Sequence, residues 1–308
     1  MNNKNSSILK IVLWSAVALI LINVMMIGIG FGSFTFGVNK YPNASKYTAG
    51  EGKIDSDSIS EIEINWIEGN VSIEIYDGDT VRFYEESRRE LDEKDMLHYY
   101  NENGRLIIQY EKPRTNIFSF GRYKYDKQLT VQVPEEMTNL KTLRLDLVSS
   151  DSDVTGINVK YLDIENISGN VSLKDIEVSE LDIETVSGSI DSDNTIVKKY
   201  ADVETTSGNA KLSGSVNRIN FESISGDLDL LSDICPEEID TDTISGDINI
   251  TIPTNEGFTY SYDGLSGDIN CEFDITKNDD EAVHGNGKSE FSFDSVSGDV
   301  NIIKKRAA

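Results

Sequence analysis

A serine recurs about every twenty residues through the second half of the chain, and this repeat constrains the fold more than any other feature. The aligned serines are Ser149, Ser168, Ser187, Ser207, Ser225, Ser245, Ser266 and Ser297. Their successive spacings are 19, 19, 20, 18, 20, 21 and 31 residues. A period held over so many intervals indicates a solenoid, whereas the blades of a β-propeller need about forty residues or more.

Apolar residues recur at fixed offsets from each serine. In one repeat, Leu162, Ile164 and Ile167 stand six, four and one positions before Ser168, and Val171 stands three after it. The alternation before the turn predicts strands with one buried face. At about 3.3 Å per residue, twenty residues cannot wrap a wide barrel. Residues 141–308 are therefore predicted to form an all-β, parallel β-solenoid of coils of about 19–20 residues, right-handed by the crossover rule.

The flanking regions are less regular. Residues 54–140 contain alternating segments without the period, and we interpret them as an irregular β-rich cap, because terminal repeats must cover an exposed core. The long last interval predicts a polar loop inserted near residues 274–288. The basic end, Lys304-Lys305-Arg306, is expected to terminate the last edge strand with charge.

The amino-terminal segment predicts a single membrane anchor. Residues 11–38 contain no charged residue, and about twenty apolar residues suffice to cross a bilayer. The run is longer than the apolar region of a secretory signal and lacks an Ala-x-Ala site after it, which favours an uncleaved transmembrane helix. Residues 1–10 would form a short cytoplasmic tail and residues 39–53 a tether. The remaining chain is expected on the extracytoplasmic side, although the flanking lysines barely differ in number.

The charge balance restricts the partners. The net charge is −26, and the first fifty residues contain four lysines and no acidic residue, so all 54 acidic residues follow the anchor. Such a region repels nucleic acid and attracts cations or basic surfaces. The two histidines, and the lack of a Gly-x-Ser-x-Gly or phosphate-loop motif, indicate a protein that is not an enzyme and that has no small-molecule substrate.

Each serine opens a turn, usually Ser-Gly followed by Asp or Asn. We interpret the turns as structural, with glycine allowing the bend and the Asx oxygen accepting a backbone N–H at the corner. A ladder of calcium sites is the alternative, but Asn and Ser also occupy the third position and would bring no charge to a metal. No cofactor is otherwise predicted. The residues given this structural role are Ser168, Gly169, Ser187, Gly188, Ser207, Gly208, Ser225, Gly226, Ser245, Gly246, Ser266, Gly267, Ser297 and Gly298.

An acidic residue stands three positions before the serine in all eight repeats, and four more stand two positions earlier on the same outward face. Like charges on neighbouring strands destabilise a sheet, so this pattern needs a reason. Either the charge keeps stacked strands soluble and unpaired, or the face binds calcium or a cationic peptide or protein. The candidate residues are Asp146, Asp163, Glu165, Asp182, Glu184, Asp202, Glu204, Glu222, Asp240, Asp242, Asp263 and Asp294.

Cys235 and Cys271 are the only cysteines, which is too few for a disulfide framework. Cys271 occupies an inward column that elsewhere holds Leu230, Ile250 and Ile302, so we expect a core thiol there. Cys235 falls at a bend before Pro236, and a bridge between coils stays open as an alternative.

The recurring unit Ile244-Ser245-Gly246-Asp247-Ile248, together with the earlier Trp66-Ile-Glu-Gly-Asn-Val-Ser-Ile73, resembles the bacterial DUF4097 family of adhesin-like proteins. The resemblance covers about residues 55–303 and implies a β-solenoid at the bacterial cell envelope, without catalytic or ligand residues.

These observations predict a non-enzymatic protein, anchored in the bacterial cell membrane, that presents an acidic β-solenoid for binding, adhesion or envelope sensing. The alternative is a structural or regulatory membrane subunit whose anchor docks a membrane partner, with the solenoid as a spacer. An enzyme acting on envelope polymers is disfavoured because the outward columns are acidic rather than aromatic.

Overall fold

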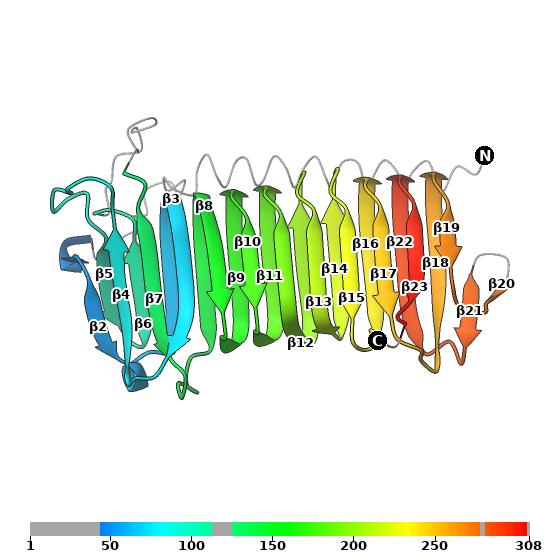
Figure 1. The fold of residues 1–308 in the computed structure, drawn as a ribbon, viewed down its shortest axis with the longest axis horizontal. Coiled ribbons are helices and arrows are strands. Elements are labelled where there is room, and N and C mark those ends of the chain that lie inside the picture. The colour runs from blue at the N-terminus through cyan, green and yellow to red at the C-terminus, as the bar shows by residue number, and fades with distance from the viewer. Residues whose placement is uncertain (1–43, 113–124, 278–280, 307–308) are drawn as a thin grey trace.

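The computed structural model describes residues 44–112, 125–277 and 281–306, which form an elongated stack of β-coils (Figure 1). Each coil gives one strand to a layer before its serine, here called layer A, and one strand to a layer after it, layer B. Equivalent strands of successive coils pair in parallel and in register. The central coils comprise β8 (Thr142–Thr155), β9 (Asn158–Ser168), β10 (Val171–Lys174), β11 (Glu177–Ser187), β12 (Ile190–Thr205), β13 (Ala210–Val216), β14 (Arg218–Ser223), β15 (Leu228–Ser232), β16 (Glu238–Ser245) and β17 (Ile248–Ile252).

The stack begins earlier in the chain than the repeat predicts. β3 (Glu61–Tyr76) pairs in parallel with β8 through both layers. β6 (Arg105–Gln109) and β7 (Gln128–Pro134) pair in parallel with the other side of β3 and form the outermost coil. The expected boundary at residue 141 therefore falls inside the solenoid. The period breaks because the chain leaves β3, builds the outer coil, and then returns to the inner side of β3.

The amino-terminal end of the stack is closed over both layers. β4 (Thr80–Glu86) pairs antiparallel with β7, and β5 (His98–Glu102) pairs antiparallel with β6. β2 (Gly52–Asp55) and β1 (Thr48–Ala49) add a further antiparallel strand to β4 and β5, respectively. Two 3₁₀ turns accompany them, η1 (Ala44–Lys46) and η2 (Ser56–Ser58). Antiparallel strands over the last parallel coil provide the cap that terminal repeats require.

The carboxy-terminal end also departs from chain order. The last coil, β22 (Ser289–Ser297) and β23 (Val300–Lys304), lies between the coil β16–β17 and the coil β18 (Gly257–Ser266)–β19 (Ile269–Cys271) (Figure 1). The prediction that Lys304-Lys305-Arg306 terminates an edge strand is therefore wrong, because β23 has neighbours on both sides. The predicted loop near 274–288 contains β20 (Thr276–Lys277) and β21 (Ala282–Gly285), and β21 pairs antiparallel with β18.

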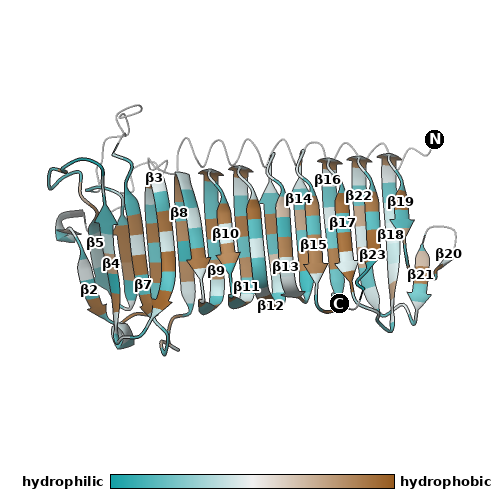
Figure 2. Ribbon diagram, viewed as in Figure 1, coloured by the Kyte–Doolittle hydropathy of each residue, from teal (hydrophilic) through white to brown (hydrophobic). Residues whose placement is uncertain are grey.

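A continuous apolar core fills the space between the layers, with Trp66, Phe221 and Phe258 among its largest side chains. Bands of hydrophobic and hydrophilic residues alternate along many of the strands (Figure 2), as expected when one face of each layer is buried. The apolar column one position before the serine is not part of this core. Its members are half-buried or exposed on the outside of layer A, because the residue before each serine has the opposite parity to the buried positions six and four before it.

None of the helices in the described ranges is long and apolar enough to cross a membrane. The predicted anchor, residues 11–38, lies outside the residues that the structure describes.

Candidate binding face

The Ser-Gly turns stack on one another along one long edge of the solenoid, and the glycine is there because the coils approach closely. A Cβ atom on Gly226 would overlap the carbonyl oxygen of Gly208 in the neighbouring coil, and one on Gly246 would overlap that of Gly226. Gly298 also has φ of 140°, a conformation that side chains disfavour. Close coil contact thus explains glycine at this position of the repeat.

The Asx residue that follows each glycine bonds to the next coil rather than to its own turn. The Oδ1 atom of Asp227 accepts from the backbone N–H of Asp247 at 2.9 Å, and the Oδ1 of Asp247 accepts from that of Asp299 at 2.9 Å. Asp151 and Asn170 make equivalent bonds to the following rungs. Each of these side chains therefore stabilises the stacking of two coils, whereas the sequence predicted a bond at a single corner.

A column of small polar residues two positions before the serine also supports the turns. Thr205 Oγ1 accepts from the backbone N–H of Gly208 at 2.8 Å, and Ser223 Oγ accepts from that of Gly226 at 2.6 Å. Both side chains are buried. This column was not predicted from the sequence. It could have been found from the recurrence of Thr, Ser or Asn two positions before the serine, on the same side of the strand as the buried apolar residues.

All eight carboxylates predicted three positions before the serine lie in one register on the outside of layer A. Glu165 pairs with Glu184, Glu184 with Glu204, and Glu204 with Glu222. Because the last coil is inserted, Asp294 lies between Asp242 and Asp263. The full order along the stack is Asp146, Glu165, Glu184, Glu204, Glu222, Asp242, Asp294, Asp263. We call this set the acidic column.

The four carboxylates two positions earlier form a shorter second column. Asp163, Asp182 and Asp202 occupy successive rungs, whereas Asn220 separates Asp202 from Asp240. Arg144 forms an ion pair with Asp163 at one end. Asn220 donates to Asp202 Oδ1 at 2.9 Å. Interspersed partners relieve part of the repulsion in this column.

An apolar ridge flanks the acidic column on the other side. It consists of the residues one position before each serine, which include Ile167, Val186, Ile224 and Ile244 and end at Leu265. Leu265 is 67% exposed, the highest value among the large hydrophobic side chains described. The outside of layer A therefore presents parallel apolar and acidic columns, and we call this surface the acidic face.

Crowding changes the protonation of the acidic face. Partial burial and the neighbouring carboxylates Glu184 and Glu222 raise the pKa of Glu204 to about 8. The same causes raise the pKa of Asp182 and of Asp242 to about 6. Like charges on neighbouring rungs disfavour the ionised forms. A bound cation would favour the ionised form of these carboxyl groups, and the ionised carboxylates would in turn hold the cation.

The face is hollowed near the carboxy-terminal end. A groove of about 340 Å³ is lined by residues of the neighbouring coils, among them Glu238, Asp240, Glu290 and the hydroxyl-bearing Ser261 and Ser292. It is continuous with the second acidic column through Asp240. Across the residues that the structure describes, no group of three or more His, Cys, Asp or Glu side chains is arranged to hold a metal ion.

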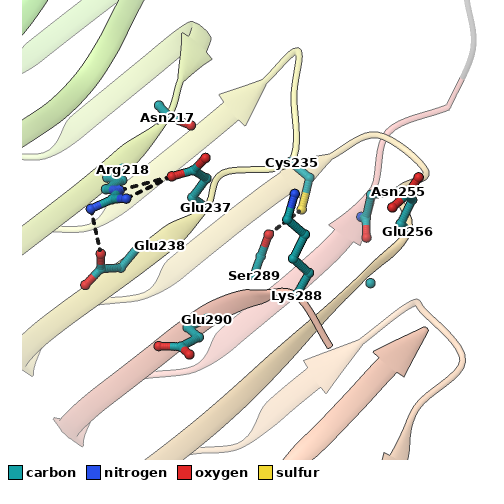
Figure 3. A pocket seen from close by; sticks show the side chains of 11 residues that line it. Asn217, Arg218, Cys235, Glu237, Glu238, Asn255, Glu256, Lys288, Ser289 and Glu290 are labelled. Atoms are coloured by element: carbon teal, nitrogen blue, oxygen red, sulfur yellow. Dashed lines mark hydrogen bonds and ion pairs between the residues drawn. The ribbon is translucent and has the colours of Figure 1, made fainter. Parts of the chain in front are cut away.

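A second pocket, of about 580 Å³, lies where the last coil enters the stack (Figure 3). Arg218 crosses its mouth and pairs with Glu237 at 3.0 Å and Glu238 at 3.8 Å. Cys235 lines it with its Sγ atom 3.7 Å from Ser289 Oγ, and burial raises the pKa of this thiol. Cys235 and Cys271 are both free thiols rather than bridged.

Comparisons with known proteins agree with the repeat. A family model described as Toastrack DUF4097 matches residues 59–303. No curated protein matches the sequence.

Several solved structures are similar at low identity. They include a "putative cell adhesion protein" from Clostridium sporogenes ATCC 15579, at 12% identity and a TM-score of 0.31, covering 84% of this chain and 100% of that one. A "putative lipid binding protein" from Parabacteroides distasonis ATCC 8503 matches at 15% and 0.45, covering 85% and 97%. A "putative adhesin" from Bacteroides fragilis NCTC 9343 matches at 11% and 0.40, covering 82% and 96%. At such values function does not transfer with the likeness.

Proposed function

This chain belongs to the Toastrack DUF4097 family, and we propose that it is a non-enzymatic, membrane-anchored binding protein of the bacterial envelope whose acidic face takes up cationic, amphipathic segments of other molecules. The observation that carries the proposal is the register of the acidic column, which sets eight carboxylates side by side along one surface.

The energetics of the column support a binding role. Placing like charges on neighbouring strands costs stability, and partial burial together with this repulsion raises the pKa of Glu204. A cationic side chain lying between two rungs would remove the repulsion and gain an ion pair in the same step. Surface ion pairs contribute only about 0–1 kcal/mol each, so affinity requires many rungs to act together.

The apolar ridge narrows the chemistry of the partner. A purely cationic polymer would satisfy the carboxylates and leave the ridge in water. A segment with basic residues on one side and aliphatic residues on the other would cover both columns, because the two run parallel. The negative charge of the face also disfavours an anionic lipid headgroup as the ligand.

The anchor and tether support a location at the membrane surface. Residues 11–38 are uncharged and long enough to span a bilayer. β1 and the start of β2 occupy part of the predicted tether of residues 39–53, so residues 39–47 separate the uncharged run from the first strand. We infer that the solenoid is displayed on the extracytoplasmic side. If instead the anchor alone recruits a membrane partner, with the solenoid as a spacer, exchanging residues 11–38 for an unrelated span would abolish the partnership.

The test is a calorimetric titration. The full-length protein, in nanodiscs of zwitterionic lipid, is titrated with a Lys/Leu peptide of amphipathic sequence, and the heat of binding is measured. We expect binding to weaken by about tenfold or more in the triple variant Glu184→Gln, Glu204→Gln, Glu222→Gln. The matched control carries Asp191→Asn, Asp193→Asn and Asp229→Asn, an identical charge change on exposed layer B residues.

Empty nanodiscs give the blank, and a scrambled peptide of the same composition tests the ridge. Equal weakening in both triple variants would show that only the net charge matters. A wild-type protein that produces no heat with either peptide would refute the proposed function.

A further inference from the structure

The two ends of the solenoid are closed to different extents. At the amino-terminal end, antiparallel strands cover the outer coil in both layers. At the other end, β21 covers β18 only from Gly257 to Tyr260. Within the described ranges, no strand lies beside the outer edge of the rest of β18 or beside the outer edge of β19.

The backbone at this end can form further strand pairs. The carbonyl of Ser266 accepts from Gly298 N–H, and the carbonyl of Asp268 accepts from Val300 N–H, so both residues direct their backbone groups inward. Backbone groups alternate along a strand, so those of Leu265 and Ile269 point outward. Exposed outward groups on an edge are a template for pairing with another chain.

The core also ends here without a full cover. Tyr262, Ile269 and Cys271 contact the core while remaining only partly buried. These three side chains come from both layers and occupy the last rung of the stack, and Leu265 stands on the edge strand β18 beside them. An apolar end of this kind fits another apolar end better than it fits water.

We propose that this open end pairs with the same end of a second copy of the chain, giving a two-fold dimer. A two-fold axis normal to both layers reverses strand direction and stack direction together. It therefore pairs β18 with β18 and β19 with β19 of the second copy, both antiparallel. The interface is isologous, which is the commonest arrangement in soluble oligomers.

The spacing of residues about the turn suits this axis. Gly264 and Asn270 each stand three positions from Gly267, on opposite layers. If the two-fold axis passes through Gly264 in one layer and Asn270 in the other, Leu265 lies opposite Asp263 of the other copy, rather than opposite a second Leu265. Leu265 N–H would then donate to the Asp263 carbonyl of the other copy, and Ile269 would lie opposite Cys271.

A second copy fits better than a single foreign strand, because one added strand could cover only one layer. A head-to-tail stack is disfavoured because the amino-terminal end is already covered in both layers. In the two-fold dimer, the acidic faces of the two copies lie on the same side of the joined stack. Added salt screens the repulsion between these faces, so the dimer should become more stable as the salt concentration rises.

The experiment is sedimentation velocity of the full-length protein in an uncharged detergent, over a range of protein concentrations. We expect a monomer–dimer equilibrium that shifts toward dimer with added salt. Leu265→Lys should raise the dissociation constant by about tenfold or more, since a lysine on an edge strand opposes pairing. Leu231→Lys, at a 38% exposed leucine in the middle of the stack, is the matched control.

Alkylation of Cys271 provides an independent readout in a Cys235→Ser background. Pairing of the open ends should slow its reaction with a maleimide as protein concentration rises, and Leu265→Lys should abolish that protection. Monomers at every concentration would overturn the proposal. Dimers that Leu265→Lys leaves unchanged would also overturn it, since they would form elsewhere, such as through the anchor. Neither outcome bears on peptide binding by the acidic face.

Discussion

At the scale of single residues, each position of the Ser-Gly-Asx turn has a separate physical task. The glycine lets two coils approach, and the Asx oxygen bonds to the next coil at 2.7–3.1 Å. In some coils, a buried Thr or Ser two positions before the turn serine accepts a hydrogen bond from the glycine N–H. The motif is therefore a stacking device whose parts act between coils.

The glycine column gives the sharpest prediction at this scale. Gly226→Ala should lower the free energy of unfolding by about 1–3 kcal/mol, because the added Cβ overlaps the Gly208 carbonyl oxygen and neither backbone can move alone. Thermal denaturation followed by circular dichroism measures the change. Gly78→Ala is the control, since its Cβ would meet only the movable ring of Tyr76. Equal melting temperatures for Gly226→Ala and the wild type would contradict the stacking explanation.

The turn also shows what the sequence could and could not reveal. The period and the buried columns such as Leu162 and Ile164 are local patterns, so the solenoid and the register of the acidic column were predictable. Bonding from Asp227 to Asp247 joins residues one coil apart, and no local pattern distinguishes it from a bond within the turn. Ile167 was grouped with the buried columns because it is apolar, although its parity places it outside.

At the scale of elements, layer A combines two opposing requirements. Its strands pair in parallel through the whole stack, yet they carry like charges on neighbouring rungs, from Asp146 to Asp263. Partial burial and the neighbouring carboxylates together raise the pKa of Glu204, Asp182 and Asp242, while the parallel strand pairing is kept.

Stability should therefore depend on pH in the opposite sense to ordinary acid denaturation. The pKa of Glu204 is about 8 in the folded chain and near 4.5 when unfolded, so the folded state holds more protons between these values. The free energy of unfolding then falls as pH rises from about 4.5 to 8. Glu204→Gln removes the charged form and should raise Tm at pH 8 by about 2–4 °C, with little effect at pH 5.

Differential scanning calorimetry across this pH range checks the prediction. Asp229→Asn, an exposed layer B residue with the same change of charge, provides the comparison. A gain in Tm from Glu204→Gln that is equal at pH 5 and pH 8 would rule out ionisation of the column as its cause.

At the scale of the whole molecule, chain order and spatial order differ at both ends. β6 and β7 lie outside β3, although they follow it in the chain. The last coil lies inside the coil of β18 and β19, although it follows that coil too. Sequence periodicity could not reveal either inversion, because every coil has the same pattern and any two can be neighbours.

The inserted coil makes the carboxy terminus unusually sensitive to truncation. A chain that stops after residue 288 would lose β22 and β23 and leave a gap between β16–β17 and β18–β19. We expect the part of this chain after residue 253 to lose its cooperative melting transition and to become sensitive to protease. A chain that stops after Arg306 keeps every described strand and should melt as the full-length protein does. Protection of β18 in the shorter chain would contradict this prediction and would show that β18 and β19 can pair directly with β16 and β17.

The position of the last coil also sets a sequence of events in the making of the protein. Coils from β8 to β17 can add one at a time as the chain emerges, each onto the edge left by the one before. β18 and β19 emerge next but have no parallel neighbour, because β22 and β23, with which they pair, follow them in the chain. This end of the stack must therefore wait, with the edges of β16 and β17 open, until β22 and β23 have been synthesised. Chaperone protection would matter most in that interval, and residues 289–304 complete the stack.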